Sequence, residues 1–133
     1  MALEDVRKKI VKDAEDRHKE IENKKTAENE AKKFIKMAED YYKNKNFSMC
    51  FYTYVKALKA LAMVYVAKKI GNVELDEQSA LAFLAKKEKY GLNLEKLEDI
   101  LMINNLILMR KEAERTECTK IRKIIEKMKE ELI

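Results

Sequence analysis

Histidine, cysteine and clustered carboxylates most often carry chemistry, and this sequence uses them sparingly. His18 is the single histidine, with Glu15 three residues before it and Glu22 four after it. On a helix these three side chains would share one surface and offer a metal one imidazole and two carboxylates. No further ligand is marked, and a histidine solvated among ion pairs, or packed near Ile21, explains the same pattern. We therefore predict no metal site.

Nucleophilic and phosphate-binding motifs are also missing. Cys50 and Cys118 lack C-x-x-C spacing and a neighbouring histidine, so we expect free thiols. The two glycines, Gly71 and Gly91, are too far apart to form a nucleophile elbow or a phosphate loop. Adjacent carboxylates such as Glu39-Asp40 would face different directions on a helix. We predict no catalytic residue, no cofactor and no enzymatic activity.

Aromatic residues, by contrast, are concentrated between Phe34 and Tyr54, where seven of the ten lie. Five aromatic residues fall on facing apolar stripes and are expected in the core: Tyr41, Phe47, Phe51, Tyr54 and Tyr65. Tyr42 and Tyr52 lie beside those stripes, so we expect them to reach the surface near Lys43, Lys45 and Lys56. Aromatic rings beside lysines can stack nucleic-acid bases, and exposed tyrosines also anchor protein interfaces. The pattern leaves both uses open.

A second basic stretch, "RKEAERTECTKIRKIIEK", occupies residues 110–127. Its acidic residues are interleaved with the basic ones, so it is either a phosphate-binding surface or a solvated helix face with ion pairs. The net charge of +5, from 29 basic and 24 acidic residues, is modest. The candidate binding residues are Tyr42, Tyr52, Lys43, Lys45, Lys56, Arg110, Arg115 and Arg122.

Helices must position these residues. The chain has no proline and only two glycines, and 40% of its residues are charged. No alternation typical of a strand extends beyond a few residues. A chain of 133 residues corresponds to one domain. We predict an all-α fold, an antiparallel bundle of four to five helices with long N- and C-terminal helices.

Local signals delimit the expected helices. Residues 1–43 form one helix or a helix pair, because the apolar stripe lapses within "ENKKTAENE", and the polar stretch "KNKN" connects this segment to a central helix, 47–70. A short helix, 76–90, is expected to start after Asp76 and stop at Gly91. Asn93 is expected to cap a last segment, 93–132, which is one helix or a pair. Its apolar stripe comprises Leu94, Leu97, Leu101, Leu108, Ile121, Ile125, Met128 and Leu132.

The bulk composition bears on location and source. The apolar run "ALAMVYVA" lies between Lys59 and Lys68, short of the roughly 20 residues that a bilayer requires. Lysine and glutamate are abundant, whereas glutamine and histidine are rare, a bias typical of thermophiles. We predict a cytoplasmic protein of an archaeal thermophile that has no membrane partner.

The stretch "AEDYYKNKNFSMCFYTYVKALKALA", residues 38–62, resembles a tetratricopeptide-type helical hairpin. The matching positions are Ala38, Tyr41, Phe47, Cys50, Tyr54, Ala57 and Leu58. A solenoid of such hairpins needs at least three copies at a period of about 34 residues. One copy is present.

The same hairpin is similar to that of the HEPN superfamily, and to small uncharacterised archaeal helical proteins such as domain of unknown function 357. "NNLILMRKEAER", residues 104–115, resembles the HEPN region in which an arginine precedes a polar helix. HEPN ribonucleases carry an Arg followed four to six residues later by a His, which handles the proton of the attacking hydroxyl. Here Arg110 is followed by "KEAER", and no histidine follows His18.

Three functional hypotheses result. The first is a non-enzymatic interaction module that forms a homodimer through its long N- or C-terminal helix, or binds a protein partner. The alternative is an RNA- or nucleotide-binding HEPN-like domain without the nuclease motif. A residual ribonuclease would require His18 to meet Arg110 in space.

Overall fold

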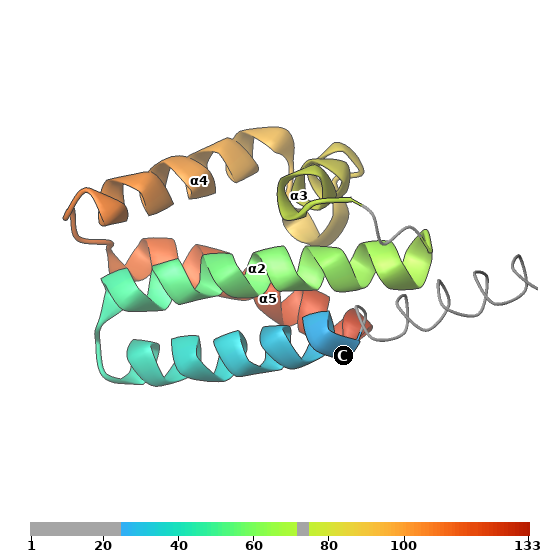
Figure 1. Ribbon diagram of the computed structural model, residues 1–133. Coiled ribbons are helices and arrows are strands. Elements are labelled where there is room, and N and C mark those ends of the chain that lie inside the picture. The colour runs from blue at the N-terminus through green and yellow to red at the C-terminus, as the bar shows by residue number, and fades with distance from the viewer. Residues whose placement is uncertain (1–24, 72–74) are drawn as a thin grey trace, which may run out of the picture.

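The computed structural model describes residues 25–71 and 75–133, and these residues form an all-α fold without strands (Figure 1). The predicted fold class is therefore confirmed. A first helical segment, residues 25–43, is followed by α2 (Phe47–Lys69), α3 (Glu77–Lys86), the 3-10 turn η1 (Lys89–Gly91), α4 (Leu94–Leu108) and α5 (Arg115–Leu132). The possible metal ligands Glu15, His18 and Glu22 lie outside the described residues, as does the question of whether residues 1–43 form one helix or two.

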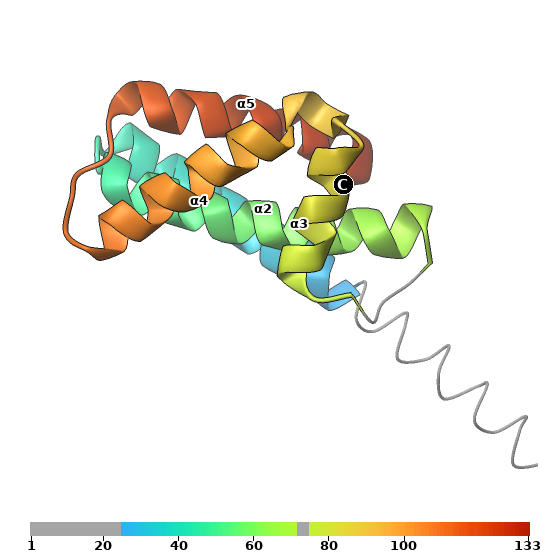
Figure 2. The same cartoon turned by 90° about the horizontal axis from the view of Figure 1, so that it is seen from above.

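Helix α2 lies at the centre of the bundle, with the first helical segment on one side, α3 and α4 on the opposite side and α5 behind it (Figures 1 and 2). Its buried residues, which include Phe51, Ala57 and Leu58, cover most of its circumference, and a narrow stripe that includes Tyr52 and Lys56 is not buried. By length and composition α2 is able to cross a membrane, but 72% of its most apolar window is buried inside the protein. The core helix of a soluble protein has the same character.

The first helical segment and α2 form an antiparallel hairpin. Its turn, residues 44–46, joins the end of the segment to the start of α2 (Figure 1). At the other end, Glu28 Oε1 lies 3.0 Å from Lys68 Nζ, so the start of the segment lies beside the end of α2. Asn46 caps α2, since its side chain accepts a hydrogen bond from the Met49 backbone N–H.

Helices α2 and α5 run in the same direction, so the bundle is not antiparallel throughout. The starts of the two helices meet where the Cys118 thiol donates to the Phe47 carbonyl at 3.1 Å. Their ends meet where Lys69 Nζ lies 3.5 Å from Glu131 Oε1. Helix α4 lies over α2 and runs in the opposite direction to α2 and α5 (Figures 1 and 2). Helix α3 crosses α2 at a steep angle (Figure 2).

Helix α3 ends earlier than the predicted 76–90 range. Asp76 caps its start, with the carboxylate accepting from the Ser79 backbone N–H at 2.7 Å. After Lys86, however, Glu88 and Tyr90 adopt positive φ angles of 53° and 59°, which an α-helix excludes. The ring of Tyr90 then packs edge-on against Tyr65 with centroids 6.0 Å apart. We attribute the early end to this tertiary contact.

The segment 93–132 is a pair of helices. Asn93 caps α4 by accepting from the Lys96 backbone N–H at 2.8 Å. Arg110, at a positive φ of 69°, turns the chain after α4. Glu114 and Glu117 form a capping box that starts α5.

The two C-terminal helices differ in how far they are buried. In α5 the predicted stripe is buried, including Ile121, Ile125, Met128 and Leu132. In α4 the predicted Leu94 and Leu108 are 47% and 63% exposed. The buried residues of α4 are Leu97, Ile100 and Asn104. Only a narrow side of α4 therefore faces the core, and the prediction of an inward stripe through Leu94 and Leu108 was wrong.

Candidate functional site

A hydrogen-bonded cluster brings together three of the predicted site residues, Tyr42, Arg115 and Arg122. Arg115 Nε donates to the Tyr42 hydroxyl at 3.5 Å. Thr119 Oγ1 donates to the Arg115 carbonyl at 2.9 Å and lies 3.3 Å from the Tyr42 hydroxyl. The bonds to Thr119 and Arg115 lower the pKa of Tyr42. Thr119 and Arg115 of α5 thus hold Tyr42 in place near the turn of the hairpin.

The surfaces of Tyr42 that a base would need are already occupied. The guanidinium of Arg122 lies 4.7 Å from the ring centroid, and that of Arg115 lies 5.9 Å away. Phe47 packs edge-on at 5.8 Å. Arg122 also forms an ion pair with Glu126, whose Oε1 lies 3.2 Å from Nε, although Nε has no aligned hydrogen-bond acceptor among the described residues. Of the two arginines that contact Tyr42, Arg115 is the one exposed to solvent.

Tyr52 and Lys56 form a separate aromatic–basic pair on α2. Lys56 Nζ lies 4.7 Å from the Tyr52 ring centroid and 5.6 Å from that of Phe34. Lys33 Nζ lies 5.7 Å from the same phenylalanine ring. The lysines therefore cover these rings, and a base could stack there only by displacing them.

The other predicted binding residues lie apart from these clusters. Lys43 and Lys45 are exposed at the turn before α2, where Lys45 has a positive φ of 59°. Arg110 is exposed in the connection between α4 and α5. Since His18 lies outside the described residues, its proximity to Arg110 stays a prediction. The eight predicted binding residues thus occupy several separate places.

Helix α4 and its C-terminal cap expose an apolar surface, of which only Leu101 and Leu108 had been predicted to lie on the inward stripe. Met102, Leu108 and Met109 are 56%, 63% and 75% exposed, and Leu101 and Leu106 are half-buried. Met102, Leu106 and Met109 follow one another at steps of four and three, so they form one outward stripe. We call these three residues the α4 stripe.

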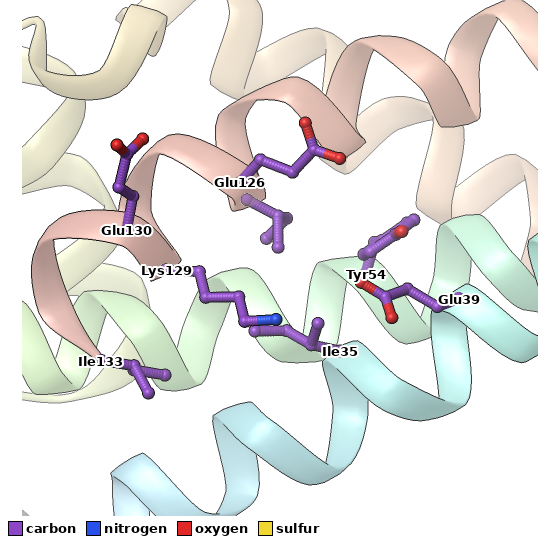
Figure 3. A pocket seen from close by; sticks show the side chains of 8 residues that line it. Ile35, Glu39, Tyr54, Glu126, Lys129, Glu130 and Ile133 are labelled. Atoms are coloured by element: carbon purple, nitrogen blue, oxygen red, sulfur yellow. The ribbon is translucent and has the colours of Figure 1, made fainter.

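A groove of about 390 Å³ lies between the first helical segment and α5, with Tyr54 of α2 at its base (Figure 3). The first segment contributes Ile35 and Glu39 to its walls. The walls contributed by the C-terminal part of the chain include Ile125, Glu126, Lys129, Glu130 and Ile133. We call this cavity the Tyr54 groove.

The residues of this groove gave no signal in the sequence. Tyr54 was predicted as a core residue, and it is 1% exposed. Its hydroxyl nevertheless has no hydrogen-bond partner among the described residues. Glu39 and Lys129 are ordinary charged residues next to apolar positions, and only the packing of the first segment beside α5 brings them to one cavity.

The two cysteines also meet in the structure. Cys50 of α2 and Cys118 of α5 are both fully buried and are free thiols. A hydrogen bond to Cys118 and burial raise the pKa of Cys50, so this thiol is a poor nucleophile. Within the described residues no group of histidine, cysteine and acidic side chains could hold a metal.

Three features are therefore the functional candidates: the Tyr42 cluster, the α4 stripe and the Tyr54 groove. The Tyr42 cluster and the Tyr54 groove are neighbours, because Arg122 of the cluster pairs with Glu126 in the groove wall. Helix α4, by contrast, lies across α2 from the first helical segment (Figure 1). No protein-family model matches this chain, and no curated protein or solved structure matches it either.

Proposed function

We propose that this chain is a non-enzymatic helical interaction module that forms a homodimer through the α4 stripe. The observation that supports this proposal is the exposure of Met102 and Met109, at 56% and 75%, on a helix of a folded bundle. A contiguous exposed apolar surface is typical of an interaction site. Methionine is also flexible enough to adapt to a partner surface.

Charge complementarity supports a second copy of the chain as the partner. The N-terminal half of α4 carries exposed acidic residues, Glu95, Glu98 and Asp99, and its end is followed by exposed Arg110 and Lys111. If two copies of α4 pack antiparallel about a two-fold axis, the acidic half of each lies beside the basic end of the other. The same patch then serves both subunits, as a two-fold interface requires.

Light scattering after size-exclusion chromatography tests the proposal. We expect the wild-type protein to be a dimer at micromolar concentration and Met102→Glu to be a monomer. Burying a carboxylate at the centre of an apolar contact should weaken the free energy of dimerisation by about 2 kcal/mol or more. The matched control is Met37→Glu, an exposed methionine of the first helical segment that is 37% exposed. A wild-type monomer across the micromolar range would refute the proposal.

A charge exchange tests the two-fold arrangement itself. Asp99→Arg and Arg110→Asp should each weaken the dimer, because each places like charges opposite one another in both halves of the interface. The double variant restores both attractive pairs and should recover the dimer. Additive weakening in the double variant would show that these residues do not face each other.

RNA or nucleotide binding is the second candidate function, and the Tyr42 cluster favours it. Arg115 is held in place by the tyrosine, and Lys43 and Lys45 are exposed at the adjacent turn before α2. The resemblance to HEPN domains supports phosphate recognition without cleavage. Against this function, the capping box of Glu114 and Glu117 occupies the helix terminus that could have bound a phosphate.

Salt dependence distinguishes this function from association alone. We expect a structured RNA to bind at low salt and to dissociate steeply as salt rises, since arginine and lysine release counterions from phosphates. Arg115→Gln should weaken that binding, whereas Lys123→Gln, elsewhere on α5, should change it less. Purified protein without 260 nm absorbance, and without RNA binding at low salt, would exclude this candidate.

A further inference from the structure

The Tyr54 groove has the size of a small-molecule site. Its volume of about 390 Å³ falls in the range of ligand pockets, which begins at about 300 Å³. Two helices form its walls and a third forms its base, so the groove is built from rigid elements (Figure 3). The first helical segment, which forms one wall of the groove, lies across α2 from α4 (Figure 1). Ligand binding in the groove therefore does not depend on the proposed dimer.

The base of the groove carries a polar atom that lacks a partner. Tyr54 is 1% exposed, and its hydroxyl forms no hydrogen bond within the described residues. Buried hydroxyls are almost always hydrogen-bonded, because an unpaired one is unfavourable. Burial raises the pKa of Tyr54, so the hydroxyl stays protonated at neutral pH and can both donate and accept. A polar ligand atom would satisfy it.

Opposite charges lie at the two ends of the groove. Glu39 lies next to Tyr54, whereas the ammonium group of Lys129 lies beside Ile35 (Figure 3). No ion pair joins Glu39 to Lys129 in the described part of the chain. Glu126 is already paired with Arg122 at 3.2 Å. Glu130 also lines the groove, but its carboxylate points away from the other labelled side chains (Figure 3). The groove therefore offers Glu39 as an acceptor at one end and Lys129 as a donor at the other.

Apolar side chains also line the groove. They are contributed by Ile35, Ile125 and Ile133. An apolar portion of a ligand would be removed from water there. A ligand with only positive charge would meet Lys129, and one with only negative charge would meet Glu39.

We propose that the Tyr54 groove binds a free amino acid with an apolar side chain, or a comparable small zwitterion. Glu39 and the Tyr54 hydroxyl accept hydrogen bonds from the ligand ammonium group. Lys129 binds the ligand carboxylate. The isoleucines contact the apolar side chain.

Isothermal titration calorimetry with three matched probes tests this assignment on the full chain. Leucine carries both charges, 3-methylbutylamine lacks the carboxylate, and 4-methylpentanoate lacks the ammonium group. We expect leucine to bind at least about tenfold more tightly than either single-charge probe, since each loses a charged hydrogen bond. Equal binding of leucine and the amine, equal binding of leucine and the acid, or no leucine binding at millimolar concentration would overturn the proposal.

Substitutions locate the site and keep the test independent of folding. Glu39→Gln and Lys129→Met should each weaken leucine binding about tenfold, because each removes one charge. Lys129→Met should leave binding of 3-methylbutylamine unweakened, which a general loss of structure would not do. Lys123→Met, on the same helix outside the groove, should leave leucine binding unchanged. Unchanged leucine binding in both Glu39→Gln and Lys129→Met would place the ligand elsewhere and overturn the assignment.

Discussion

Replacing Tyr54 with phenylalanine should stabilise the ligand-free protein. The substitution keeps the ring, which is 1% exposed in the core, and removes a hydroxyl that has no partner among the described residues. A buried polar group without a hydrogen bond costs about 1–3 kcal/mol. We take the lower bound and expect a gain of about 1 kcal/mol in the free energy of unfolding.

Chemical and thermal denaturation followed by circular dichroism measure this gain. A gain of about 1 kcal/mol should raise the melting temperature by about 3–5 °C in a domain of this size. Leucine should narrow this difference in stability. At about ten times its dissociation constant, it should add about 1.4 kcal/mol to the wild-type protein and less to Tyr54→Phe, which cannot offer the hydroxyl.

Tyr52→Phe is the matched control. Tyr52 lies on the same helix, but it is only half-buried and its ring contacts Lys56. Loss of its hydroxyl should change stability by no more than about 0.5 kcal/mol. If Tyr54→Phe instead destabilised the ligand-free protein by about 1 kcal/mol or more, the hydroxyl would have a bonding partner, and the reasoning from an unsatisfied group would be refuted.

Other expectations follow from the core, the thiols, a helix cap and the dimer. Leu58→Ala should lower the free energy of unfolding by about 2–5 kcal/mol, because the side chain is fully buried; urea denaturation measures the loss. Cys50 and Cys118 should react with a thiol reagent only after denaturation, since both are buried; fast labelling of the native protein would contradict this. The backbone hydrogen bond from Ser79 lowers the pKa of Asp76. The stability that the Asp76 carboxylate contributes is therefore present at neutral pH and lost as the pH falls below about 4. Asp76→Asn caps the helix without titrating, so the difference in unfolding free energy between the wild-type protein and this variant should disappear in acid. Met102→Glu should raise the dissociation constant of the dimer at least about tenfold in sedimentation equilibrium.

Local chemistry made much of the architecture predictable from the sequence. Asp76 and Asn93 were predicted as caps because their side chains can accept from a backbone N–H two or three residues later, and both do so. Phe51 and Tyr54 were predicted in the core because their spacing keeps them on one side of a helix, and both are buried. These interactions join residues within one or two helical turns, so neighbouring letters of the sequence contain the necessary information.

The places where prediction and structure differ involve residues far apart in the chain. The apolar residues of α4 are distributed around the helix, so periodicity alone did not indicate that Leu94 and Leu108 would be exposed. Cys118 lies in a polar stretch, yet the packing of α5 against α2 buries it. Which side of an amphipathic helix is covered depends on which neighbour packs there, and a single sequence does not state this.

By itself, the sequence determined that the described part of the chain is helical, where α2, α3 and α4 begin, and which residues form much of the core. Its lack of glycine and proline and its helical spacing of apolar residues suffice for that. Only the tertiary structure decided that α2 and α5 run in the same direction, that two arginines contact Tyr42, and that Glu39 and Lys129 share a groove with an unpaired Tyr54 hydroxyl. The physical reason is that helix formation depends on contacts between near neighbours, whereas a site depends on the relative orientation of helices, which side-chain packing selects.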